Sequence, residues 1–108
     1  MARYKTAEAR RMAIERLAAE VCYHALNYYP PNSPATVFLL ILSAFAPMPA
    51  MEPAEIGVPE AGTLGWQELE LLKKWLTKMW KVCETPEDIQ YLYDLVYECP
   101  EWLHERYA

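Results

Sequence analysis

The side chains most able to bind a metal ion are Cys22, His24, Cys83, Cys99 and His104. Structural zinc sites usually take their ligands from closely spaced cysteine or histidine pairs, such as C-x2-4-C and H-x3-5-H. The sequence has no such pair, and a straight helix between Cys83 and Cys99 would hold their thiols roughly 20 Å apart. We therefore predict reduced, structural thiols and neither a metal nor another cofactor.

Nucleophilic catalysis would require a nucleophile, a base positioned beside it and an oxyanion donor. The chain contains no glycine-rich phosphate loop, no HExxH and no GxSxG. We expect His24 and His104 to be surface residues, and we predict that the protein is not an enzyme. A small enzyme or metal-binding protein ranks third among the functions considered, and a histidine found beside a cysteine in a pocket would favour it.

The charge of the chain is unevenly distributed. The formal net charge is −5, and residues 51–108 hold twelve of the fifteen acidic side chains against five basic ones. Binding to nucleic acid through phosphate contacts requires an excess of lysine and arginine on one face. Direct nucleic-acid binding is therefore not expected.

Residues 84–108 combine seven acidic side chains with several aromatic ones. Aromatic side chains anchor protein interfaces, and carboxylates steer the approach of a basic partner. The second half of the chain is thus predicted to bind a protein partner through Trp75, Tyr91, Asp94, Leu95, Glu98, Glu101, Trp102 and Glu105.

An alternative is that the acidic side chains only form a solvated face. In that case the lysines of the preceding helix, Lys74, Lys78 and Lys81, would neutralise Asp94 and Glu98 within the same molecule. An exposed acidic row without such partners would instead favour a basic target.

These side chains must be positioned by helices, because apolar residues recur at three- and four-residue steps and no strand-like alternation is present. The first helix, residues 6–28, has an apolar face, and Arg11/Glu15 and Arg16/Glu20 are expected as i,i+4 pairs on its charged face. Further helices are expected at residues 65–83, 86–98 and 101–107.

The second helix, residues 35–46, carries no charged side chain. Ser33 is a suitable N-cap, Pro34 fits the first turn and Pro47 ends the segment. A helix without a polar face must be enclosed on every side, by the rest of this chain, by a second copy or by a partner. The segment is too short to cross a bilayer, so we expect no membrane association and a cytoplasmic location.

We predict a single all-α domain over residues 1–108, a small bundle of four to five helices with the apolar second helix at its centre. Residues 1–46 and 64–108 are expected to form two helix hairpins, joined by a proline-rich crossover at 47–63. Because Trp75 and the apolar second helix need cover, we expect a homodimer.

The predicted function is a non-catalytic protein-protein interaction module, such as an adaptor, an assembly factor or a regulatory subunit. The alternative is a small acidic inhibitor that occupies the basic, nucleic-acid-binding surface of a target protein, as host-takeover and anti-defence proteins do.

Overall fold

The chain is all-helical in the part that the structure, a computed structural model, describes: residues 5–27, 33–45 and 64–107. Its helices are α1 (Ala7–Asn27), α2 (Pro34–Phe45), α4 (Trp66–Val82), α5 (Pro86–Glu98) and α6 (Glu101–Tyr107). The predicted all-α bundle is confirmed. The predicted crossover at 47–63 lies outside the described residues.

Local side-chain contacts explain where two of these helices begin. At the start of α2, the Ser33 hydroxyl accepts a hydrogen bond from the Thr36 amide at 3.3 Å. At the start of α5, the Thr85 hydroxyl accepts from the Asp88 amide while the Asp88 carboxylate accepts from the Thr85 amide, both at 3.2 Å. Both caps satisfy amides that have no partner within the helix, so the helix starts predicted from the sequence are confirmed.

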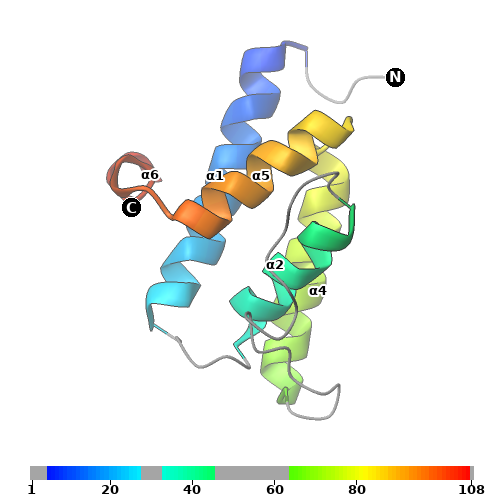
Figure 1. The fold of residues 1–108 in the computed structure, drawn as a ribbon, viewed down its shortest axis with the longest axis vertical. Coiled ribbons are helices and arrows are strands. Elements are labelled where there is room, and N and C mark those ends of the chain that lie inside the picture. Colours follow the sequence, from blue (N-terminus) through cyan, green and yellow to red (C-terminus); the bar gives the residue numbers. More distant parts are fainter. Residues whose placement is uncertain (1–4, 28–32, 46–63, 108) are drawn as a thin grey trace.

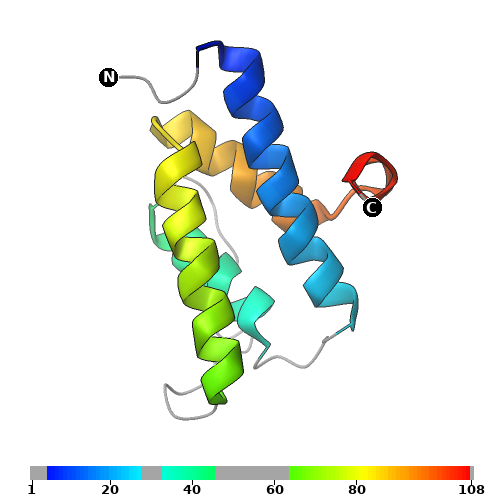
Figure 2. The ribbon, with the colours of Figure 1, turned by 180° about the vertical axis from the view of Figure 1, so that it is seen from behind.

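Four helices form two layers. In Figure 1, α5 and α2 lie in front of α1 and α4, and Figure 2 shows the same pairs from behind. The largest packing contacts join α1 to α5, α2 to both α4 and α5, and α1 to α4. Each of these contacts links the first half of the chain to the second half.

This pairing differs from the two hairpins expected within the bundle, because α4 and α5 barely contact each other along their lengths. They are separated by a short connection in which Cys83 and Thr85 both have extended backbone conformations. The chain therefore leaves α4 at a steep angle, and α5 packs on α1 and α2 instead (Figure 1).

The core is built around α1, which contacts every other described helix. The apolar face predicted for this helix is buried at Ile14, Leu17, Ala18 and Val21. These side chains meet Phe38 and Leu42 of α2 and the inner sides of α4, α5 and α6 in one cluster. The bundle therefore has a single hydrophobic core.

Trp75 lies inside this core, with 0% of its surface exposed. Its ring makes edge contacts with His24, at 5.2 Å between ring centroids, and with Phe38, at 5.6 Å. The prediction that Trp75 needs cover from a second copy is therefore wrong, because the monomer already buries it. The helix is apolar over a wide arc, and packing against both α1 and α2 buries the side of α4 that contains Trp75 and Met79.

α2 is buried on one side by the described part of the chain. Ala35, Phe38 and Leu42 are buried, whereas Leu39 and Leu40 are half-buried. The described residues therefore do not enclose this helix completely, and its enclosure by a second copy or by a partner stays a prediction. Among the described residues, no helix combines the length and the apolar character needed to cross a membrane.

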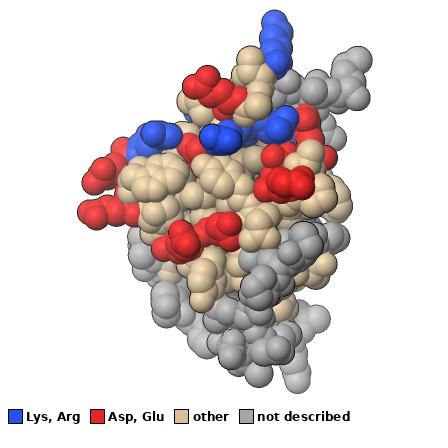
Figure 3. Space-filling model, turned by 45° about the horizontal axis from the view of Figure 1, so that its top comes forward, with Lys and Arg blue, Asp and Glu red and all other residues tan. Residues whose placement is uncertain are grey.

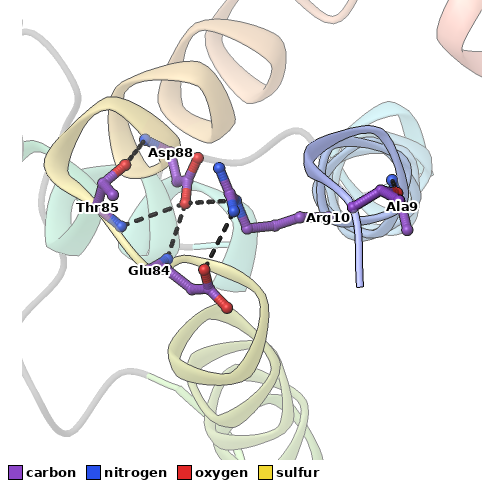
Figure 4. Close-up of polar contacts among 6 residues, drawn as sticks. Ala9, Arg10, Glu84, Thr85 and Asp88 are labelled. Atoms are coloured by element: carbon purple, nitrogen blue, oxygen red, sulfur yellow. Dashed lines mark hydrogen bonds and ion pairs between the residues drawn. The ribbon is translucent and has the colours of Figure 1, made fainter. Parts of the chain in front are cut away.

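Arg10 of α1 fixes the corner between α4 and α5 (Figure 4). Its guanidinium lies 3.1 Å from the Glu84 carboxylate and 3.0 Å from the Asp88 carboxylate. Asp88 also accepts from the amides of Glu84 and Thr85. The same carboxylate therefore caps α5 and joins it to α1.

Replacement of Phe38 by alanine should lower the free energy of unfolding by about 3–5 kcal/mol, because it empties a fully buried site beside Trp75. The matched control Leu40→Ala, on the half-buried side of α2, should cost clearly less. Urea denaturation of both variants measures the difference. Equal losses would show that both sides of α2 are equally enclosed.

Candidate functional site

Five of the eight predicted partner-binding residues lie exposed on α5 and α6. They are Trp102 and the acidic side chains Asp94, Glu98, Glu101 and Glu105. Two aromatic side chains are exposed on the same helices: Trp102, at 40%, and Tyr97, at 51%. We call these six residues the α5–α6 surface. Tyr97 was not among the predicted binding residues, although its place in the acidic stretch could have indicated it.

The other predicted binding residues are not freely exposed. Leu95 is only 5% exposed, because both α1 and α2 pack on α5 and cover a wide arc of it. Tyr91 is half-buried, and its hydroxyl donates to Glu15 of α1 at 2.7 Å. Trp75 is buried as well, so the prediction that Trp75 and Leu95 contact a partner is wrong, while Tyr91 is partly accessible.

The lysines of α4 do not neutralise the α5–α6 surface. Lys74 and Lys78 instead pair with Glu20 of α1, at 3.7 and 3.2 Å. Within the described part of the chain, no ion pair involves the four carboxylates of the α5–α6 surface. The Asp94 carboxylate accepts a hydrogen bond from the uncharged side-chain amide of Gln90, at 2.9 Å.

The two aromatic side chains of this surface are held by neighbours. Tyr97 stacks on the buried Tyr93, with 5.9 Å between ring centroids and an interplanar angle of 7°. The Arg106 guanidinium lies 5.2 Å from the centre of the Trp102 ring. Figure 3 shows a face on which groups of acidic side chains lie around neutral ones, with a row of basic side chains beside them. The surface is therefore mixed, with aromatic rings between charges.

Glu15 is a buried carboxylate on α1, with 5% of its surface exposed. Besides the Tyr91 hydroxyl, it accepts from the Arg106 guanidinium at 2.9 Å and from the Tyr107 hydroxyl at 3.2 Å. The sequence predicted Glu15 on a charged outer face paired with Arg11, and the structure contradicts this. The carboxylate is buried because α5 and α6 close over it, and Arg11 lies over the Tyr91 ring instead.

Glu15 changes the acidity of the phenols around it. Burial, followed by the hydrogen bond to the Glu15 carboxylate and its negative charge, raises the pKa of Tyr91 to about 12. Burial and the same carboxylate also raise the pKa of Tyr107. The folded protein therefore favours the neutral phenols as donors to the buried charge.

The structure brings two cysteines and a histidine together where α5 meets α6. The Cys99 sulfur lies 3.2 Å from Nε2 of His104. The Cys22 thiol of α1 donates to the carbonyl oxygen of Leu95 at 3.5 Å. Burial, with a further contribution from the neighbouring Cys99 thiol, raises the pKa of Cys22 well above its usual range. No pattern in the sequence indicates that Cys22 and Cys99 are neighbours, because Cys22 lies on α1 and Cys99 follows α5.

Neither histidine is the simple surface residue that was expected. His104 is half-buried beside Cys99, and His24 is half-buried against the edge of Trp75. Burial lowers the pKa of His24, opposed by the nearby negative charge of Glu68. Among the described residues, no group of three or more potential ligands could hold a metal ion.

No protein-family model, curated protein or solved structure matches this chain.

Replacement of Tyr91 by phenylalanine should lower the free energy of unfolding by about 1.5–3 kcal/mol, because it removes a hydrogen bond to a buried charge. In the wild type, the neutral Tyr91 phenol stabilises the fold fully below pH 10. This contribution should disappear as the pH rises from about 10 to about 12, through the raised pKa of Tyr91.

Urea denaturation at a series of pH values measures both effects. Tyr93→Phe is the matched control, because it removes a phenol on the same helix that has no hydrogen bond to Glu15. The interpretation is wrong if both variants lose stability equally between pH 10 and pH 12.

Proposed function

We propose that this protein is a non-catalytic interaction module whose α5–α6 surface binds a basic surface of a partner protein. The observation that carries the proposal is that the four carboxylates of this surface are exposed to solvent and have no ion-pair partner among the described residues. Lys74 and Lys78 of α4 pair with Glu20 instead.

The charges of this surface would act before the contact forms. Unpaired carboxylates attract a basic partner over about one Debye length, which is roughly 8 Å at physiological ionic strength. They raise the association rate more than they raise the affinity. A basic partner would also supply the cations that Asp94, Glu98, Glu101 and Glu105 do not find within the described residues.

The exposed aromatic side chains would supply the apolar part of the contact. Tyrosine and tryptophan are enriched among the residues that contribute most to binding energy, since they bury a large area with few rotatable bonds. Tyr97 and Trp102 are partly fixed by Tyr93 and Arg106, so little side-chain freedom would be lost on binding. The surface thus combines aromatic anchors with a charged rim.

An acidic inhibitor of a nucleic-acid-binding protein is the second candidate. The same unneutralised carboxylates favour it, because a protein surface that binds phosphates presents a matching excess of lysine and arginine. Competition between this protein and nucleic acid for the purified partner distinguishes the two candidates. Only an inhibitor displaces the nucleic acid.

A homodimer remains a prediction, and the argument from Trp75 no longer supports it, since this side chain is buried within the monomer. Exposed Trp66 and Trp80 on α4, together with the half-buried side of α2, still provide apolar surface for self-association. Light scattering on the purified protein tests this directly.

The double variant Glu98→Lys/Glu101→Lys should bind the partner at least about tenfold more slowly, because it removes and reverses the steering charge. Partners are first identified by affinity purification from the native cell, and association rates are then measured by surface plasmon resonance. Wild-type affinity should fall between 50 and 500 mM salt, as the Debye length shrinks from about 14 to about 4 Å.

The control variant Glu8→Lys/Glu70→Lys makes the same change in net charge on exposed positions of α1 and α4, and it should bind like the wild type. Trp102→Ala should cost about 2 kcal/mol or more of binding free energy. The proposal fails if the two double variants behave alike and Trp102→Ala has no effect.

A further inference from the structure

We propose that Cys99, Cys22 and His104 form a peroxide-reactive thiol site, in which Cys99 is the attacking thiol, His104 its base and Cys22 the resolving thiol. This site is separate from the interaction proposed above, and it goes beyond the expectation of inert structural thiols. Its three side chains come from α1, from the end of α5 and from α6.

The geometry assigns a different role to each thiol. Cys99 is half-buried, and its sulfur lies 3.2 Å from Nε2 of His104, within reach for proton transfer. Cys22 is fully buried, so it is shielded from direct attack by a reagent in solution. The reactive sulfur is therefore Cys99, and Cys22 is available only to a sulfur that reaches it from within the protein.

The Cys22 thiol and the Cys99 backbone amide meet at one carbonyl oxygen of α5. The Cys22 sulfur donates to the carbonyl oxygen of Leu95 at 3.5 Å, and the Cys99 amide donates to the same oxygen at 2.8 Å. The Cys22 sulfur also lies 4.0 Å from the carbonyl oxygen of Val96. Cys22 of α1 is thus held against the last turn of α5, where Cys99 follows.

The backbone at Cys99 is in an unusual conformation. With φ 48° and ψ 58°, it is left-handed, and among the described residues it is the only non-glycine with a positive φ. Such a conformation is unfavourable for a residue with a side chain, and glycine is the usual residue at this position after a helix. Strained residues of this kind cluster at functional sites, and here the strained residue carries the thiol beside His104.

The reaction would proceed in two steps. His104 takes the Cys99 proton, and the thiolate attacks one oxygen of hydrogen peroxide, so that an S–O bond forms and the O–O bond breaks. The departing hydroxide takes the proton from His104 and leaves as water. The Cys22 thiol then attacks the sulfenic acid on Cys99, which gives a disulfide and a second water. In total, two thiols lose two electrons and two protons, and one peroxide is reduced to two waters.

Peptide mapping of the wild-type protein tests this site. The reduced protein is treated with about one equivalent of hydrogen peroxide, its remaining thiols are blocked with N-ethylmaleimide, and it is digested without reductant. We expect a peptide pair joined through Cys22 and Cys99, with Cys83 alkylated. Cys83 is the internal control, because it is also a half-buried thiol but lies at the other end of α5, after α4.

Three variants separate the roles. Cys22→Ser keeps a hydroxyl donor for the Leu95 carbonyl, and it should accumulate a sulfenic acid on Cys99 that dimedone traps. His104→Gln cannot accept the proton, and it should slow the oxidation of Cys99 by at least about tenfold. Cys83→Ser should oxidise at the wild-type rate. Circular dichroism shows whether each variant is folded.

The proposal is overturned if Cys99 and Cys83 oxidise at equal rates, if the disulfide includes Cys83, or if His104→Gln reacts as fast as the wild type. The wild-type peptide map requires no substitution, so it decides the question even if Cys22→Ser does not fold.

Discussion

The arrangement of α5 and α6 on α1 depends on the buried carboxylate of Glu15. A charge in the protein interior is tolerated only when it is paired and hydrogen-bonded, and the loss of one partner leaves it uncompensated at a cost of several kcal/mol. Tyr91 of α5 and Arg106 and Tyr107 of α6 supply these partners together. The short last helix could hardly form alone, and its contacts with α1 hold it in place.

The position of α6 determines what the rest of that end of the molecule can do. It presents Trp102, Glu101 and Glu105 beside the exposed side chains of α5, and it places His104 against Cys99. The left-handed backbone at Cys99 is the bend that allows both results. The α5–α6 surface and the cluster of Cys22, Cys99 and His104 therefore both depend on where this short helix lies.

Much of the fold could be predicted from the sequence, because helix ends depend on nearby residues. Ser33 and Thr85 cap the helices they precede, Pro86 begins α5, and the apolar face of α1 is visible from its spacing. The exposure of the acids on α5 and α6 was also predictable, since charged side chains without a buried partner stay in solvent. The sequence by itself thus determined the helices and where most of the charge lies.

The tertiary structure decided which side of each helix is buried and which distant residues meet. α4 and α5 are apolar over wide arcs, so only their neighbours determine that Trp75 and Leu95 lie inside. Glu15 resembles any charged residue of an amphipathic helix until α5 and α6 close over it. Cys22 lies next to Cys99 because α1 crosses the end of α5, although the two are far apart in the chain. These contacts depend on how the helices pack, and no local pattern of residues encodes them.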